Sequence, residues 1–257
     1  MVEVLHAPRP SGILPSIVLA AHRIGIPPWR TARLNDVRPL ESGDTDLWFA
    51  AFDAIIDAAV IADSSVLDAA ERVRAAAIGD STARARFVAA RLLLRALLAR
   101  YANVPPVAVH IEMGAHGKPL LRAPSALQFN VSHSGNGLLI AIAAAVTVGV
   151  DYEAPRRLTD PQRLAQRVFS AAELAALQSA AAESEAAHHA LFMRLWTRKE
   201  ALLKALGSGF AGGFKDYDVR ADSVGGHILY SFDTPAPGTA ALAQVLAGRV
   251  RSAFVWS

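Results

Sequence analysis

The chain has 257 residues, of which 53% are hydrophobic, and a formal net charge of +3 at pH 7. This size accommodates one large domain or two ordinary ones, with ample apolar material for a core. The sequence holds no cysteine, which excludes disulfides, thiol nucleophiles and cysteine-ligated zinc. Because this is in keeping with a reducing compartment, we expect a cytoplasmic protein.

The first 44 residues contain six of the fourteen prolines and show no sustained periodicity, so we predict an irregular extension over residues 1–44. An apolar stretch within it is broken by Pro15 and preceded by Glu3, unlike a secretion signal. Residues 46–53 are compatible with a first strand, and the alanine-rich residues 65–77 with a helix.

The strongest helical pattern of the N-terminal part lies over residues 82–101. Residues 107–113 then alternate as a strand does, and residues 114–119 form a turn. The polar residues 129–137 predict a loop, of a kind that can hold phosphates. The apolar residues 138–150 that follow are too few to span a bilayer and predict a buried strand, so we expect no membrane segment.

A capping box marks the next helix start, with Ser170 as N-cap and Glu173 at N3. Before it, Thr159-Asp160-Pro161 also suits a helix start. Residues 188–206 predict a long helix, with Leu206 among its inward side chains and Gly207 and Gly209 ending it. The remaining strands are expected at residues 217–220, 227–232 and 249–256.

Residues 71–100 carry seven arginines but only two acidic residues, which offers a local anion site. Interleaved leucines over residues 92–98 mark an amphipathic helix with a buried face, and no nucleic-acid motif accompanies the charge. We therefore expect no nucleic-acid partner.

Two carboxylates end the apolar run, Asp151 and Glu153. In an extended segment they point to the same side, while Tyr152 points to the other. Two like charges this close raise the pKa of one of them unless a cation intervenes, and a hard divalent ion with oxygen ligands is the common remedy. The plainer alternative is a solvated turn.

On the long helix, Trp196, Glu200 and Lys204 are spaced by four and form one stripe. A third carboxylate and an ammonium group therefore share one face. Together with the strand-end acids they indicate a magnesium site that holds an anionic substrate, because Mg²⁺ commonly completes its coordination with phosphate oxygens. Taken alone, Glu200 with Lys204 is also an ordinary surface pair.

Five motifs occur in an order and spacing that resemble the 4'-phosphopantetheinyl transferases of the surfactin-synthetase-activating (Sfp) type. The resemblance extends over about residues 45–232, and the chain is similar to the two-halved monomeric class rather than to the half-length holo-acyl-carrier-protein synthases. The motifs lie at residues 117–119, 129–134, 149–153, 169–173 and 195–207.

The resemblance implies an α+β fold, with two similar α/β halves in a pseudo-twofold arrangement and the site between them. We divide the chain into the extension at 1–44, an N-terminal half at 45–148 and a C-terminal half at 149–257. Because one chain contains both halves, we expect a monomer.

The implied reaction moves the 4'-phosphopantetheine arm of coenzyme A, the co-substrate, to a serine of an apo carrier protein and leaves adenosine 3',5'-bisphosphate. It implies Mg²⁺, with Mn²⁺ as an alternative. The carrier is left open among acyl carriers of fatty-acid biosynthesis, polyketide carriers and peptidyl carriers of nonribosomal peptide synthesis. Two other functions also stay open: a non-catalytic coenzyme A-binding homologue, and another magnesium-dependent enzyme that cleaves a diphosphate.

At the positions that match the family's motifs, the resemblance implies that Asp151, Glu153 and Glu200 ligate the metal. It gives catalytic roles to Glu200, which would take the proton from the attacking serine, and to Lys204, which would face the diphosphate. The implied coenzyme A contacts are Lys118, Ser132, His133, Lys199, Lys204, Arg86, Arg72 and Arg74. Tyr152 stands where the family commonly has an aliphatic residue, so its hydroxyl has to reach solvent or a partner.

Overall fold

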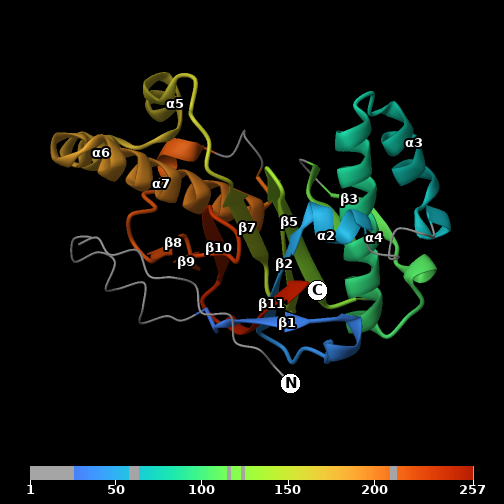
Figure 1. The fold of residues 1–257 in the computed structure, drawn as a ribbon. Helices are drawn as coiled ribbons and strands as arrows, with labels where there is room; N and C mark the ends of the chain where they lie inside the picture. The colour runs from blue at the N-terminus through green and yellow to red at the C-terminus, as the bar shows by residue number, and fades with distance from the viewer. Residues whose placement is uncertain (1–25, 58–63, 115–116, 123–124, 209–212, 257) are drawn as a thin grey trace.

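Two β-sheets lie between helices in the computed structural model of the chain (Figure 1). The structure describes residues 26–57, 64–114, 117–122, 125–208 and 213–256. The described part mixes helices and sheets, which confirms the predicted α+β class. It contains no helix long and apolar enough to cross a membrane.

The first sheet has five strands in the order β1-β11-β2-β6-β5. Strands β2, β6 and β5 pair antiparallel, whereas β11 pairs parallel with both β2 and β1. The end of the chain therefore completes the sheet that the N-terminal residues begin. The bounds are β1 Trp29–Ala32, β2 Asp44–Ala51, β5 Leu127–Ser134, β6 Gly137–Ala144 and β11 Arg249–Trp256.

The second sheet is antiparallel in the order β7-β10-β9-β8. Three strands of each sheet share one order, β7-β10-β9 here and β2-β6-β5 in the first sheet. In both sets, the strand that comes first in the sequence pairs with the one that comes third, and the third pairs with the second. This repetition agrees with two similar halves. The bounds are β7 Val148–Glu153, β8 Ser223–Val224, β9 His227–Phe232 and β10 Thr239–Val245, with a separate hairpin of β3 Ile111–Met113 and β4 Pro119–Leu121.

A long helix covers each sheet, α4 over the first and α7 over the second (Figure 1). The α-helices are α2 Phe52–Asp57, α3 Ala69–Ala77, α4 Ser81–Ala102, α5 Pro161–Val168, α6 Ala171–Glu183 and α7 Glu185–Leu206. Short 3-10 turns are η1 Leu34–Asp36, η3 Ser64–Val66, η4 Pro106–Ala108 and η7 Phe214–Asp216. The predicted capping box of α6 is confirmed, Asp160 caps α5, and α7 ends at Gly207 with a left-handed φ of 70°.

Strand β6 shows why the sequence contains such a long apolar run. All eight of its residues are buried. Leu138 and Ile140 pack in the core under α4, and the alternate residues Leu139 and Ala141 pack in a core between the two sheets. A strand covered on both faces loses the polar alternation of a half-exposed strand.

Several sequence predictions are corrected. The supposed loop at 129–137 is strand β5 up to Ser134, followed by a turn, and the single strand at 138–150 is two strands joined by a turn in which Ala145 has a φ of 60°. Strand β1 and η1 lie in the extension expected to be irregular. The first strand ends at Ala51 because α2 begins there.

Further corrections concern shorter segments. Residues 65–77 begin as η3 before α3, and residues 107–113 are η4 followed by β3. Residues 217–220 form no strand, whereas β10 was not predicted. Leu206, expected inward, is 37% exposed, and Gly209 lies outside the described residues, as do residues 1–25. The proposed boundaries of the two halves stay a prediction.

Candidate active site between the two sheets

Edge strands of the two sheets, β5 and β7, face each other without a backbone ladder. Side chains of β5 bridge them instead. The backbone N–H of Val150 donates to Asn130 Oδ1 at 2.9 Å, and that of Tyr152 donates to Ser132 Oγ at 3.2 Å. Since buried backbone donors need partners, the polar sequence of β5 serves this junction.

Helix α7 crosses β7 at Gly149. A Cβ there would lie 2.1 Å from the carbonyl oxygen of Ala201 and 2.3 Å from the backbone nitrogen of Ala205. Only glycine permits so close an approach of two backbones. The contact brings the stripe of Glu200 and Lys204 beside the end of β7.

Asp151 is 4% exposed, and its Oδ1 accepts hydrogen bonds from Ser132 Oγ at 2.8 Å and from Lys204 Nζ at 2.6 Å. Burial raises the pKa of Asp151, while the charge and hydrogen bond of Lys204 oppose that rise. Lys204 Nζ also donates to Ser132 Oγ at 3.2 Å. Ser132 of β5, Asp151 of β7 and Lys204 of α7 therefore form one hydrogen-bonded cluster.

Two buried carboxylate oxygens, Asp151 Oδ2 and Glu200 Oε1, have no hydrogen-bond partner among the described residues. Burial raises the pKa of Glu200 to about 7, an effect that Lys204 opposes and Asp151 reinforces. Unpaired oxygens of this kind cost free energy unless a proton or a cation satisfies them. Their chemistry therefore suits a hard divalent ion.

Glu153 points to β5 beside Asp151, as strand alternation predicts. Its oxygens accept from Ser134 Oγ at 2.8 Å, Arg156 at 3.1 Å and Trp196 Nε1 at 3.2 Å. In the part of the chain that the structure describes, no three His, Cys, Asp or Glu side chains are grouped as a metal site requires. The ligand set of Asp151, Glu153 and Glu200 therefore stays a prediction.

A pocket of about 240 Å³ adjoins these residues and is lined by Lys118, Asn130, Glu200, Lys204 and Phe214, among others. Lys118 Nζ donates to the carbonyl oxygen of Ala205 at 3.0 Å, near the end of α7. Burial lowers the pKa of Lys118 to about 8. Two lysines thus face a pocket with a carboxylate in its wall.

Two basic side chains, His133 of β5 and Arg86 of α4, lie around the Phe52 ring of α2. His133 is exposed, and its ring packs edge-on to that of Phe52 at 6.0 Å, while the Arg86 guanidinium lies over the same ring at 5.5 Å. Partial desolvation of the ring by neighbouring protein atoms is the first cause that lowers the pKa of His133, followed by the positive charges of Lys204 and then Arg86. Phe52 was missed by the sequence analysis, because an aromatic residue after a strand carries no specific signal.

Lys199 is placed elsewhere. It is 1% exposed, and its Nζ donates to Glu173 Oε2 at 2.8 Å and to the carbonyl oxygens of Phe214 and Tyr217 at 2.5 and 2.6 Å. These partners use all three donors of the ammonium group. In this arrangement Lys199 has no donor left for a phosphate, and its contact with coenzyme A stays a prediction.

Two exposed arginines of α3 make contacts away from the pocket. Arg72 donates to the carbonyl oxygen of Leu67, and Arg74 lies over the Phe87 ring at 5.4 Å. The Tyr152 hydroxyl has a partner, since it donates to the carbonyl oxygen of Pro237 at 2.9 Å.

Two family models match the chain in succession. The N-terminal model of the 4'-phosphopantetheinyl transferases matches residues 59–147, and the model of the 4'-phosphopantetheinyl transferase superfamily matches residues 147–254. The chain belongs to the 4'-phosphopantetheinyl transferase superfamily, which confirms the family that the ordered motifs predicted.

Curated relatives carry the same family name. The transferase HetI of Nostoc sp. is 40% identical over 131 residues, which are 50% of this chain and 54% of HetI. The transferase psf-1 of Bacillus pumilus is 32% identical over 152 residues, 59% of this chain and 63% of psf-1. AcpT of Salmonella typhimurium is 37% identical over 113 residues, 44% of this chain and 56% of AcpT. The chain spans about half the length of the curated relatives it matches.

Proposed function

We propose that the protein transfers the 4'-phosphopantetheine arm of coenzyme A to a serine of an apo carrier protein and releases adenosine 3',5'-bisphosphate. The observation that carries the proposal is the Asp151–Lys204 pair at a lysine-lined pocket, where Asp151 Oδ2 and Glu200 Oε1 have no hydrogen-bond partner among the described residues. Family membership supports the same reaction.

The reaction forms a bond between the serine oxygen and the β-phosphorus of coenzyme A and breaks the bond from that phosphorus to the bridging oxygen. The serine proton has to leave, and the departing phosphate gains negative charge. Glu200 Oε1 is an oxygen that can accept the proton. Lys204, fixed by Asp151 and Ser132, supplies positive charge beside the phosphates.

The same reaction suits a divalent ion. Asp151 and Glu200, joined by Glu153, would hold Mg²⁺ or Mn²⁺, and the bound ion would neutralise charge on the diphosphate oxygens. Lys118 at the pocket, and His133 with Arg86 beside Phe52, would bind the phosphates of coenzyme A. Arg72 or Arg74 would contact the 3'-phosphate of coenzyme A.

The direct test mixes purified protein with coenzyme A, Mg²⁺ and an apo carrier, and follows the carrier by intact-protein mass spectrometry. A mass gain of one phosphopantetheine arm, lost when the carrier serine is replaced by alanine, supports transfer. Bound coenzyme A with unmodified carrier indicates the non-catalytic homologue. Cleavage of coenzyme A without transfer indicates a diphosphate-cleaving enzyme.

Glu200→Gln should lower kcat by about 10²-fold or more, comparable to the loss of one preorganised catalytic contact. Glu185→Gln is the matched control, because Glu185 is exposed at the start of the same helix. Equal rates for the two variants would remove Glu200 from the mechanism.

A panel of apo acyl, polyketide and peptidyl carriers, compared by kcat/KM, identifies the carrier class.

A further inference from the structure

We propose that Trp29 is a positioning residue, which holds the two sheets together on the face of their junction opposite Asp151 and Glu153 (the rear face) and so keeps both walls of the pocket in place. Its effect on coenzyme A binding rests on the proposed function, whereas its contacts do not. Trp29 belongs to β1, which precedes residues 59–254 that the family models match. The residue therefore lies outside the part of the chain on which family membership rests.

The rear face of the junction is filled by the ring of Tyr152. This ring points away from Asp151 and Glu153, because successive side chains of a strand point to opposite faces. It packs edge-on against the Phe49 ring of β2, with the ring centroids 5.3 Å apart. A Cβ at Gly137 of β6 would lie 2.4 Å from the same ring. Strand β7 of the second sheet is thus packed directly against the first sheet.

Trp29 extends this packing across both sheets. Its indole lies 6.2 Å from the Phe49 ring of the first sheet and 6.2 Å from the Phe232 ring of β9 in the second. Its Nε1 donates to the carbonyl oxygen of Asp233, directly after β9, at 2.9 Å. The backbone of β1 stays in the first sheet, paired with β11 (Figure 1). Because aromatic pairs attract beyond the area that they bury, Trp29 ties the second sheet to the first.

The pocket depends on this link because its two walls come from opposite sides of the junction. One wall lies at residues 117–131, in the β3–β4 hairpin and β5, and the other at residues 200–214, in α7 and the residues after it. A ligand that contacts both walls binds only while their separation is right. A looser junction lowers the fraction of protein in that arrangement, and the apparent affinity falls by the same factor.

Metal binding should respond differently. The proposed ligands Asp151, Glu153 and Glu200 lie on β7 and α7, on one side of the junction. Their mutual placement is set by the contact of α7 with β7, to which Trp29 does not belong. Loss of Trp29 should therefore weaken coenzyme A binding and leave metal binding nearly unchanged.

The experiment compares Trp29→Leu with Trp256→Leu. Trp256 is the matched control, because it lies on the neighbouring strand β11 but packs in the core under α4. By titration calorimetry, W29L should bind coenzyme A about 10-fold more weakly, as the loss of two aromatic contacts between the sheets implies, and W256L should bind it almost as the unaltered protein does. Unchanged affinity in folded W29L, or equal losses in the two variants, would overturn the proposal.

Titration with Mn²⁺, followed by electron paramagnetic resonance, separates positioning from general damage. The Mn²⁺ affinity of W29L should stay close to that of the unaltered protein. In the transfer assay with saturating apo carrier, the KM for coenzyme A should rise while kcat changes little, because bound coenzyme A restores the arrangement of the walls. A fall in Mn²⁺ affinity as large as that for coenzyme A would contradict the proposal.

A distance measurement tests the link without any ligand. The chain contains no cysteine, so spin labels can be attached to Thr82→Cys on α4 and Ser179→Cys on α6, both exposed positions. Double electron–electron resonance should give a broader distance distribution in W29L than in W256L or with both tryptophans intact. Equal distributions would overturn the proposal. A broader distribution in a protein that modifies no carrier would leave the link standing and the transfer function refuted.

Trp29→Phe keeps a ring between Phe49 and Phe232 but loses the N–H group that binds Asp233. It should recover most of the coenzyme A affinity that W29L loses. If W29L does not fold, Phe232→Leu removes the same contact from the second sheet and takes its place in each measurement. A folded W29F that binds coenzyme A as weakly as W29L would contradict the proposal.

Discussion

Lys118 is a residue whose charge is set by its surroundings. Its ammonium group lies in the pocket wall against carbonyl oxygens of Val148 and Ala205, and burial lowers its pKa from 10.5 to about 8. Carbonyl partners bind the ammonium form but bring no opposite charge, so desolvation prevails. Lys118 therefore changes charge close to physiological pH.

This lowered pKa predicts a pH dependence of coenzyme A binding. Above about pH 8 Lys118 loses its proton, so the KM for coenzyme A should rise between about pH 7 and pH 9. Lys118→Arg keeps its charge over this range and should flatten the profile. Steady-state kinetics across pH check both, with the exposed Lys215→Arg as control. A level KM in the unaltered protein would exclude Lys118 as a charged phosphate ligand.

The free energy of unfolding responds to the deprotonation of Lys118 in the opposite direction from coenzyme A binding. Between about pH 8 and 10.5 the unfolded chain keeps a proton on Lys118 that the folded chain has lost. Stability from this group therefore rises with pH across that window. Weaker binding above pH 8 is then an effect on the ligand site and cannot be attributed to unfolding caused by Lys118.

At the scale of elements, the helices could be predicted from local sequence patterns, whereas the polar strands could not. The capping box of Ser170 and Glu173 and the apolar stripe of α7 are local signals, so both helices were predicted. Strand β5 was mistaken for a loop, because Asn130 and Ser132 are polar and their partners lie on another sheet. Strand β10 was missed because alanine favours strands poorly.

The residues of the candidate site likewise fall into those that local spacing predicted and those whose partners lie on another element. Strand alternation placed Asp151 and Glu153 on one side, and helical spacing placed Glu200 with Lys204. Lys199 precedes Glu200 directly, and successive helical residues do not face the same way. Its ammonium is buried against Glu173, a partner that lies on α6 and that no spacing along α7 could reveal.

The crossing of α7 over β7 gives a prediction at this scale. Gly149→Ala should push the helix from the strand, because the new Cβ would meet backbone atoms of Ala201 and Ala205 that cannot move aside alone. We expect a loss of about 1–3 kcal/mol in the free energy of unfolding. We also expect about 10²-fold lower kcat/KM, since Glu200 and Lys204 shift with the helix.

Denaturant unfolding and carrier modification measure these two effects. The control is Gly79→Ala, since a Cβ at Gly79 has no heavy atom within 4 Å among the described residues and needs no unusual backbone. If Gly149→Ala keeps the activity and stability of the control, the close helix–strand contact is not what assembles the site.

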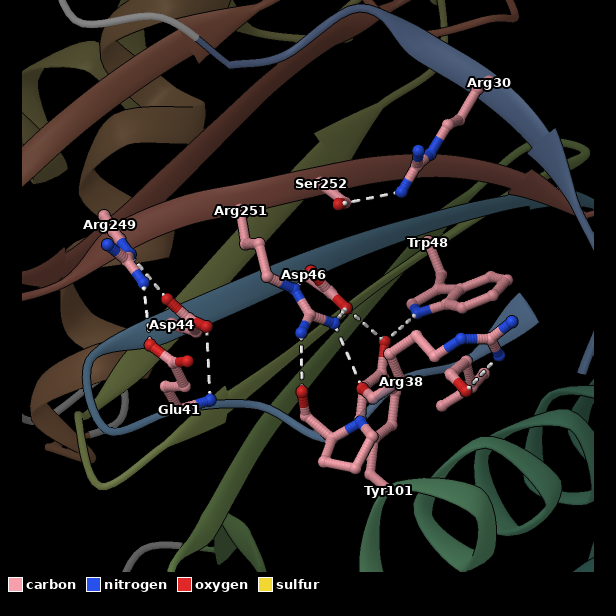
Figure 2. A network of polar contacts seen from close by, with 12 residues as sticks. Arg30, Arg38, Glu41, Asp44, Asp46, Trp48, Tyr101, Arg249, Arg251 and Ser252 are labelled. Carbon is pink, nitrogen blue, oxygen red and sulfur yellow. Dashed lines mark hydrogen bonds and ion pairs between the residues drawn. The ribbon is translucent and has the colours of Figure 1, made fainter. Parts of the chain in front are cut away.

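At the scale of the whole molecule, the last strand joins the two ends of the described chain. Strand β11 lies between β1 and β2, and ion pairs fasten it: Arg249 to Asp44 at 2.6 Å and Arg251 to Asp46 at 2.5 Å (Figure 2). The Tyr101 hydroxyl of α4 donates to Asp46 at 2.7 Å. The carboxylate of Asp46 on β2 therefore binds side chains from both β11 and α4.

Asp46 is 0% exposed, so Arg251 and Tyr101 take the place of water around its carboxylate. Burial raises the pKa of Tyr101 far above its usual value, which keeps the hydroxyl protonated as a donor. Arg251→Met would leave a buried carboxylate without its counter-ion. We expect the free energy of unfolding to fall by about 3 kcal/mol, at the lower end for a broken buried pair because the Arg251 side chain is 26% exposed.

Adding Asp46→Asn to Arg251→Met should recover part of that loss, because the unpaired charge is removed while Tyr101 keeps an acceptor. Denaturant unfolding of both single variants and the double variant measures the coupling. Because β11 belongs to the sheet that carries β5, opening of this strand should also lower carrier modification as denaturant rises, before global unfolding. Additive losses in the double variant would show that Arg251 and Asp46 do not stabilise each other.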